Sequence, residues 1–231
     1  MRLDKFIGQC SELSRSQIHQ AVKAGRVSIN GLIAQKADVK LDGSETVMLD
    51  DQLIALQPLR YLMLHKPLGY ICANRDPAHP VVIDLLDLPN KQALQIVGRL
   101  DIDTTGLVLL TDDGQWNHRI TSPRHECQKT YRVTTADPIT PDTAGRFAAG
   151  VQLHGEKSLT RPAQLEIISS RQARLHIHEG KYHQVKRMFA AVGNHVVALH
   201  REAIGSIQLD AELAQGEYRS LTQEEIQSID K

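Results

Sequence analysis

The chain is poor in three features that often reveal function: aromatic residues, cysteine and an excess of charge of one sign. Aromatics make up 4% of the 231 residues, too few for a broad base-stacking sheet. Three cysteines without a Cys-x-x-Cys spacing fit neither a disulfide framework nor a zinc knuckle, and they favour a reduced, cytoplasmic compartment. The sequence also lacks an apolar run long enough for a membrane span or a secretory signal, so we expect neither.

The charge of the chain is balanced overall but unevenly distributed. Twenty-seven bases against 27 acids give a net charge of zero, which at first argues against a nucleic-acid partner. Residues 1–40, however, carry seven bases and three acids, and residues 171–201 carry six bases, one acid and five of the 11 histidines. Because local clusters of Lys and Arg bind phosphate backbones, the zero net charge does not exclude RNA. A solvated charged face is the alternative interpretation of either cluster.

Two domains are expected, residues 1–58 and 59–231, joined by a linker at Gln57-Pro58-Leu59-Arg60. The composition, 41% apolar and 23% charged, is that of an ordinary globular protein. In the first domain, apolar residues at positions 3, 6, 7 and 10 predict one short helix. A capping box of Ser14 and Gln17 predicts the start of a second helix, which Gly25 ends.

A hairpin should follow these helices. The dipeptide Asn30-Gly31 lies between two short apolar strands and suits a type I′ turn, and a last strand over residues 46–49 closes the domain. Two helices and a hairpin with a basic face resemble the small RNA-binding module shared by a small-subunit ribosomal protein, bacterial tyrosyl-tRNA synthetases and several RNA-modifying enzymes. The bases that we expect on its polar face are Arg2, Lys5, Arg15, Lys23 and Arg26.

The second domain is expected to be α+β, with a mainly antiparallel sheet and few helices. Period-two and short apolar segments predict seven strands, and apolar stripes predict helices over residues 142–150 and 182–192. The seven expected strands cover residues 61–64, 94–97, 107–110, 131–134, 164–168, 174–178 and 196–199.

The densest group of polar residues lies between two of these strands, over residues 98–114. A strand that delivers Asp101 and Asp103 two positions apart is typical of Mg²⁺-dependent aspartyl-phosphate phosphatases. A hairpin with capping aspartates is the structural alternative. A metal site at Asp103, Asp112 and Asp113 is a further alternative, although two of the three suit turn capping.

Four segments in order give a third interpretation, since together they resemble the RNA pseudouridine synthases. Gly98-Arg99-Leu100-Asp101 matches the central motif of that family, Lys66-Pro67 its Lys-Pro loop, Lys129-Thr130-Tyr131 its Lys-x-Tyr motif, and residues 175–188 its third motif. Residues 111–124 resemble the branch that modifies bacterial 16S ribosomal RNA at uridine-516. The phosphatase interpretation leaves the Lys-Pro loop and the third motif unexplained.

The resemblance assigns roles to matched positions. Asp101 matches the essential aspartate of the family, which acts as a nucleophile or as an electrostatic stabiliser. As a nucleophile it could attack either the ribose or the uracil ring, since both routes use the same residue. Lys186 matches the basic residue that pairs with this aspartate, a position at which many relatives have Arg. Because Lys lacks the two-pronged donor geometry of Arg, the sequence defines the pair better than its geometry. Tyr131 matches the tyrosine that stacks on the target uracil.

Two further bases belong to the expected substrate site. Arg99 matches a residue that enters the space left by the flipped nucleotide, with a phosphate contact as the alternative. Lys66 is expected to shape the pocket or to contact a phosphate. His176 and His178 lack a third zinc ligand, and His183 is expected to serve RNA contact or structure.

The sequence therefore predicts an RNA pseudouridine synthase that modifies ribosomal RNA without metal or cofactor. We expect a monomer whose partner is 16S ribosomal RNA or a partly assembled small subunit. The alternatives are the Mg²⁺-dependent phosphatase and a non-catalytic ribosome-assembly factor that binds RNA.

Overall fold

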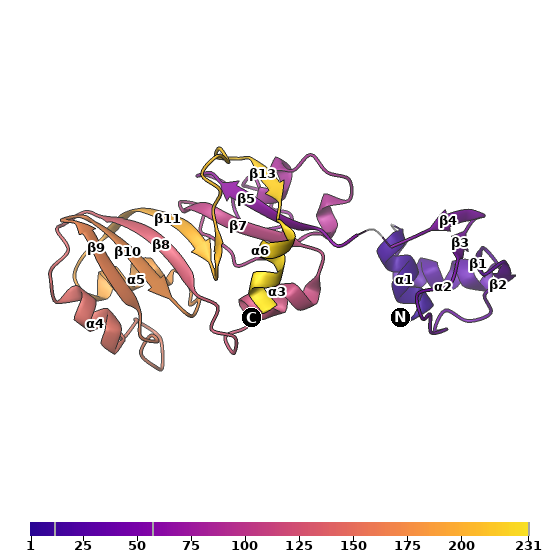
Figure 1. Cartoon of the computed structure of the whole chain (residues 1–231), viewed down its shortest axis with the longest axis horizontal. Helices are drawn as coiled ribbons and strands as arrows, with labels where there is room; N and C mark the ends of the chain where they lie inside the picture. Colours follow the sequence, from indigo (N-terminus) through magenta and orange to yellow (C-terminus); the bar gives the residue numbers. More distant parts are fainter. Residues whose placement is uncertain (12, 57, 231) are drawn as a thin grey trace. The chain divides into compact units, whose positions relative to one another are not determined.

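The structure is a computed structural model that describes residues 1–11, 13–56 and 58–230. The chain divides into two compact units, Met1–Pro58 and Leu59–Lys231, called here the small unit and the large unit. Of the expected linker, Gln57 lies outside the described residues. Each unit is treated by itself below (Figure 1).

The small unit begins with the two expected helices, α1 (Leu3–Cys10) and α2 (Arg15–Lys23). The predicted capping box is present, because the Ser14 side chain accepts from the Gln17 amide and the Gln17 side chain accepts from the Ser14 amide. Gly25 follows α2 with a φ of 73°, a left-handed conformation that suits glycine and stops the helix.

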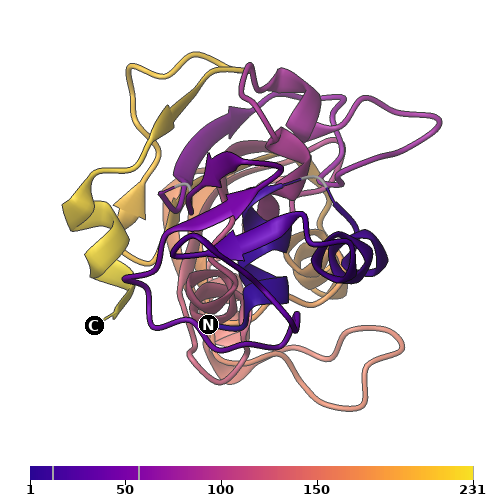
Figure 2. The ribbon, with the colours of Figure 1, turned by 90° about the vertical axis from the view of Figure 1, so that its right-hand side faces the viewer.

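A four-stranded antiparallel sheet completes the small unit, in the order β2-β1-β3-β4 (Figure 1). Figure 2 shows the same ribbon turned by 90°. The predicted hairpin turn is confirmed, since Asn30 and Gly31 have φ values of 50° and 80°. The strand β4 was not expected; it follows a second tight turn in which Asp50 and Asp51 adopt left-handed φ values of 53° and 59°. The strands are β1 (Val27–Ile29), β2 (Leu32–Ile33), β3 (Val47–Leu49) and β4 (Gln52–Ile54).

The large unit is built on a nine-stranded mixed sheet, which confirms the expected α+β class. The order is β13-β5-β7-β11-β8-β10-β9, with β6 paired to β7 and β12 to β11. Within the described part of this sheet, β7 and β11 run parallel and the other pairs are antiparallel. The strands are β5 (Tyr61–Lys66), β6 (Gln95–Val97), β7 (Thr105–Thr111), β8 (Lys129–Thr135), β9 (Gln164–Ser169), β10 (Gln172–Ile177), β11 (Val196–Ile204), β12 (Ile207–Gln208) and β13 (Tyr218–Ser220).

The strand β7 is an interior strand of the sheet and is buried on both faces. Leu107 and Leu109 belong to one apolar cluster, whereas Val108 and Leu110 belong to another, as the alternation of side chains along a strand requires. Trp116 of α3 (Gly114–Thr121) packs in the first cluster. The rings of Phe147 on α4 (Thr143–Ala149) and Phe189 on α5 (Gln184–Ala191) meet edge to face in the second, with centroids 5.1 Å apart. Helices of the large unit therefore pack on both faces of β7.

Two of the helices of the large unit were predicted, and two were not. The expected helices are α4 (Thr143–Ala149) and α5 (Gln184–Ala191). Asp113 caps the unexpected α3 by accepting from the amides of Gln115 and Trp116. The other elements are α3 (Gly114–Thr121), α6 (Gln223–Gln227) and the 3-10 turns η1 (Val82–Leu85), η2 (Lys91–Ala93) and η3 (Ser228–Asp230).

None of the helices in the described residues is long and apolar enough to cross a membrane. The three cysteines are free thiols. Burial raises the pKa of Cys72 and Cys127.

Candidate active site

The loop that carries Asp101 leaves β6 and enters β7, and two glycines allow its path. Gly98 has a left-handed φ of 72°. Gly106 lies directly beside Arg201 of the parallel strand β11, and an added Cβ would overlap the main chain of that residue. The glycines of this segment are therefore required by the backbone, one for conformation and one for close approach.

The Asp101 carboxylate is held by two side chains from the third motif. Lys186 on α5 donates from Nζ to Oδ2 at 3.0 Å, and His183 Nε2 lies 3.4 Å from Oδ1. The side chains of Asp101, Lys186 and His183 are 27%, 24% and 38% exposed, so all three are partly accessible to solvent. The fold thus brings together residues that are 85 positions apart in the chain.

Lys186 also bonds Asp103, and the two carboxylates share its ammonium. Partial burial opposes the charge on Lys186, but the hydrogen bonds and charges of Asp103 and Asp101 outweigh it and raise its pKa. Burial opposes the ionisation of Asp103 in the same way, yet its bond to Lys186 lowers the pKa of that carboxyl. Lys186 is therefore a cation at neutral pH.

Lys66 lies beneath the same loop and has no exposed surface. Its ammonium donates to the main-chain carbonyls of Thr104 at 2.7 Å, Pro67 at 3.1 Å and Ile102 at 3.5 Å. Burial lowers the pKa of Lys66. The expected phosphate contact is incompatible with this placement, because the ammonium is enclosed and bonded to protein. Lys66 instead ties the loop of Asp101 to the end of β5.

Arg201 was counted in the sequence only as part of a basic cluster, and that interpretation was wrong. Its side chain is 1% exposed and lies in β11, which extends past its expected end at residue 199. The guanidinium donates to the carbonyls of Leu107 at 2.8 Å and Gly98 at 2.5 Å. It is also 3.4 Å from Tyr131 Oη, with its central carbon 5.9 Å from the centre of that ring.

Tyr131 and Arg99 are connected to the site through this arginine. Tyr131, on β8, is 8% exposed and pairs with Arg201 in the sheet register. The Arg99 side chain is exposed, and its carbonyl lies 3.5 Å from Arg201 Nη1. The structure therefore brings Asp101 and Lys186 into direct contact, and joins Tyr131 and the main chain of Arg99 through Arg201.

The basic zone of residues 171–201 is largely neutralised within the large unit. Lys181 and Arg187 pair with Glu156 at 3.1 and 3.2 Å, outside the segment. Arg174 pairs with Glu202 at 2.8 Å. The excess of bases in this part of the sequence therefore does not form an equally basic surface.

The five bases expected on the face of the small unit are exposed, but three of them have acidic partners. Arg2 pairs with Asp4 at 2.7 Å, and the Arg15 guanidinium lies 3.6 Å from the same carboxylate. Arg26 pairs with Asp50. Lys5 and Lys23 are also exposed, and the RNA contact expected of them stays a prediction.

The other carboxylates and histidines considered as metal ligands have structural partners. Asp112 accepts from the Arg60 amide at 2.7 Å, and Asp113 caps α3. His176 Nδ1 lies 3.0 Å from Thr130 Oγ1. Among the residues that the structure describes, no three His, Cys, Asp or Glu side chains are grouped as a metal site requires.

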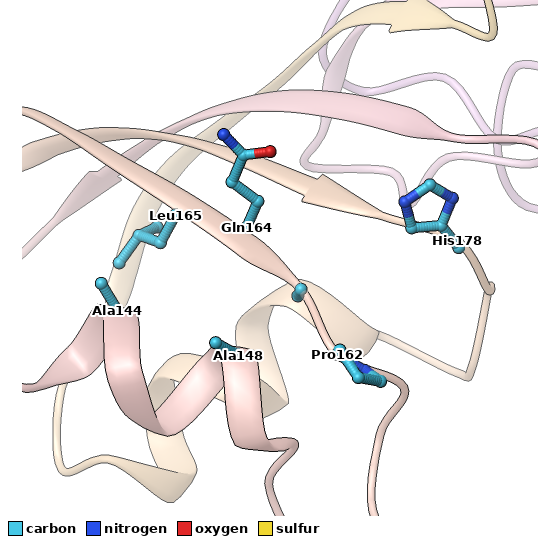
Figure 3. Close-up of a pocket in the computed structure, with 7 residues that line it drawn as sticks. Ala144, Ala148, Pro162, Gln164, Leu165 and His178 are labelled. Atoms are coloured by element: carbon cyan, nitrogen blue, oxygen red, sulfur yellow. The ribbon is translucent and has the colours of Figure 1, made fainter.

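A cavity of about 430 Å³ lies between α4 and the start of β9, separate from the loop of Asp101. Figure 3 shows Ala144 and Ala148 on one side of it, with Leu165, Gln164 and His178 across from them. The residues expected at the active site do not line this cavity.

Both units of the chain are similar to known protein families. A sequence model of the RNA pseudouridylate synthase family matches residues 60–191, and a model of the S4 domain matches residues 1–47. The first match spans the loop of Asp101 and all of α5.

Two curated relatives are similar along their whole length. "Ribosomal small subunit pseudouridine synthase A" of Escherichia coli strain K12 is 59% identical over 230 residues, covering 99% of this chain and 100% of the relative. The protein of the same name from Vibrio cholerae is 52% identical over 229 residues, covering 99% of each chain. A solved structure described as a pseudouridylate synthase superimposes with a TM-score of 0.73 at 49% identity, over 99% of each chain.

Proposed function

Since the chain belongs to the RNA pseudouridylate synthase family, isomerases that act on RNA, we propose that it converts a uridine of small-subunit ribosomal RNA to pseudouridine. The substrate is proposed from the names of the curated relatives, which are similar along the full chain. The nucleotide that we expect is uridine-516 of 16S ribosomal RNA, from the resemblance of residues 111–124. A ribosomal substrate and free thiols also fit the cytoplasmic compartment expected from the sequence.

The contact between Asp101 and Lys186 carries the proposal. Isomerisation breaks the bond from N1 of uracil to C1′ of ribose and forms a bond from C5 to C1′, with one proton lost from C5 and one gained at N1. A carboxylate suits this sequence because it can bond to a carbon atom and leave again. Lys186, 3.0 Å away, orients Asp101 through a charged hydrogen bond, whether the carboxylate attacks ribose or uracil.

Tyr131 and Arg99 are proposed to receive the flipped nucleotide. Tyr131 is anchored in β8, and Arg201 contacts its hydroxyl. The ring is therefore fixed, and one of its faces is proposed to stack on the target uracil. Stacking on a ring replaces part of the stacking that the base loses when it leaves the RNA. The exposed side chain of Arg99, two residues from Asp101, is proposed to fill the space that the nucleotide vacates.

The small unit is proposed to add RNA affinity or site selection, while the large unit holds the chemistry. Its match to the S4 domain and its exposed bases support this division. The same proposal predicts that loss of the small unit affects binding of RNA more than the rate of the bound complex.

Asp101→Ala and Asp101→Asn test the assigned carboxylate. We expect both variants to bind 16S ribosomal RNA like the wild type and to form no pseudouridine, as measured by chemical mapping of the incubated RNA. Asp103→Asn is the matched control, because it removes the second carboxylate bonded to Lys186 and keeps the first. Normal modification by either Asp101 variant would show that the nucleophile is wrongly assigned.

The two alternatives differ from this proposal in other ways. A non-catalytic assembly factor would support ribosome assembly equally well with Asp101→Ala. In a phosphatase of the kind considered above, Mg²⁺ bridges the two carboxylates, whereas here the Lys186 ammonium lies between them. Mapping of ribosomal RNA from cells that lack this protein identifies the nucleotide, and pseudouridine at uridine-516 in those cells would overturn the site proposed.

A further inference from the structure

Tyr182 is unusual among the aromatic side chains of this protein. All nine rings lie in the described residues, and the other eight are buried or half-buried. Tyr182 is 74% exposed. A single exposed apolar group is common on protein surfaces, so its surroundings decide whether it has a function.

Those surroundings lead directly to Asp101. The rings of Tyr182 and His183 are stacked, with centroids 3.8 Å apart and planes 20° apart. The edge of the His183 ring is 3.4 Å from Asp101, measured from Nε2 to Oδ1. The exposed ring is therefore one imidazole away from the carboxylate that we assign to catalysis.

The backbone holds this stack in a conformation that is unfavourable for most residues. His183 has φ 46° and ψ 38°, the left-handed region, immediately before α5. Such a conformation persists only where the surrounding contacts determine it, and it is found preferentially at functional sites. The observation supports a function for the stack beyond the packing of α5.

Several hydrogen bonds fix the turn that presents the two rings. Arg187 donates to the Tyr182 carbonyl at 2.9 Å and to the His154 carbonyl at 2.5 Å. Gln184, which is 4% exposed, accepts from the Lys181 amide at 2.8 Å. A ring pair on a fixed turn loses little conformational freedom when a ligand stacks on it, so binding there costs less.

We propose that Tyr182 and His183 form a stacking platform for an unpaired base that neighbours the target uridine. The inference rests on the proposed function, because it takes RNA as the ligand of Asp101. A uridine that enters the site leaves its neighbours without a stacking partner, and the exposed face of Tyr182 supplies one. An aromatic face accepts any base, so the platform selects an unpaired RNA segment rather than a particular letter.

Fluorescence of 2-aminopurine tests the platform at the binding step. The probe replaces, one at a time, the two nucleotides on each side of uridine-516 in a 16S ribosomal RNA fragment. At saturating protein we expect one position to be quenched several-fold by the wild type and by Tyr182→Phe, which keeps the ring. Tyr182→Ala should lose that quench. The control Val197→Ala removes another exposed apolar side chain, on β11, and should retain it.

Kinetics give a second readout of the same contact. Stacking of one base on an aromatic ring corresponds to about 5- to 100-fold in affinity. We therefore expect Tyr182→Ala, and separately an abasic nucleotide at the quenched position, each to lower kcat/KM by a factor in this range. The two changes together should cost no more than either one, because they remove the same contact. Fully multiplicative losses would overturn the platform.

Failure of the platform is distinguishable from failure of the proposed function. If the wild type modifies the fragment but Tyr182→Ala has normal kcat/KM and normal quenching, the platform is wrong and the function stands. If the wild type leaves the fragment unmodified, the substrate is wrong. The platform is then tested with a single-stranded oligouridylate that carries one 2-aminopurine. If the wild type and Tyr182→Ala quench its fluorescence equally, the platform is wrong.

Discussion

The small and large units use basic residues in opposite ways. In the small unit, the side chains of Lys5 and Lys23 are exposed. In the large unit, Lys66 and Arg201 have 0% and 1% of their surface exposed and bond main-chain carbonyls. We propose that the exposed lysines attract the RNA backbone, whereas the buried bases hold the loop of the candidate site. Counting bases along the sequence does not distinguish them.

Arg201→Ala should have the largest effect, because it removes an interior cation. The carbonyls of Gly98 and Leu107 would lose their donor and a cavity would form beside Tyr131. We expect a loss of about 3 kcal/mol or more in the free energy of unfolding. Denaturant unfolding of the full chain measures this. Arg201→Lys keeps the charge but has fewer hydrogen-bond donors, so its free energy of unfolding should lie between those of the wild type and Arg201→Ala. A wild-type unfolding midpoint for Arg201→Ala would refute the interior role.

Lys186→Ala should come next, as a loss of activity with little loss of structure. Without its ammonium, Asp101 loses the cation that orients it. We expect kcat to fall by about 100-fold or more, since a charged hydrogen bond at the reacting group is removed. Lys186→Arg should recover most of the rate, because it restores the charge. Single-turnover formation of pseudouridine measures both, and equal rates for the alanine and arginine variants would contradict the charge argument.

Lys5→Ala and Lys23→Ala should have a moderate effect that is confined to binding. Each lysine that contacts a phosphate adds about one unit to the slope of log affinity against log salt. We expect weaker binding of 16S ribosomal RNA and a shallower salt slope, with kcat unchanged. Lys91→Ala is the matched control from the large unit, because the Lys91 ammonium bonds the Leu86 carbonyl at 2.8 Å. An equal loss in the control would remove the contrast between the units.

The smallest effect should be on the pH dependence of stability. The pKa of Asp103 is lowered, so its ion pair stabilises the fold above its unfolded pKa of about 4 and is lost as the pH falls through the folded value. The pKa of Lys186 is raised, so its contribution is present below about pH 10.4 and is lost as the pH rises through the folded value.

Thermal unfolding across pH tests this window. Between about pH 4 and pH 10 the free energy of unfolding of the wild type should exceed that of Lys186→Met by less than about 1 kcal/mol. The difference is small because Asp103 is 65% exposed and water screens its ion pair with Lys186. The difference should shrink toward either end. A difference that is constant across the whole range would exclude the ion pair as its source.

Much of the fold was predictable because its signals are local. The capping box of α2, the Asn30-Gly31 turn and the apolar stripe of α5 each depend on residues within a few positions of one another. Most of the elements that were missed are short or lie at the sheet edges, and the exception is α3, a helix of eight residues. The strand β4 follows a turn built from Asp50 and Asp51, without the glycine that usually signals such a turn.

The candidate site was predictable in its residues and less so in its arrangement. The order of the family motifs indicated Asp101 and Lys186, and the structure places the two in contact. His183 was noted as a candidate for RNA contact or structure, without its position 3.4 Å from the carboxylate. The location of Arg201 between β7 and β8 depends on the pairing of three strands that are distant in the sequence.

The sequence by itself determined the family of this protein, its α+β class and the chemical groups that its motifs supply. Only the tertiary structure decided which charges face water and which hold the loop of Asp101 in place. The physical reason is that burial and ion pairing depend on neighbours from remote segments. Glu156 neutralises Lys181 from 25 residues away, and Thr104 accepts from Lys66 across 38 residues. No local pattern in the chain records those distances.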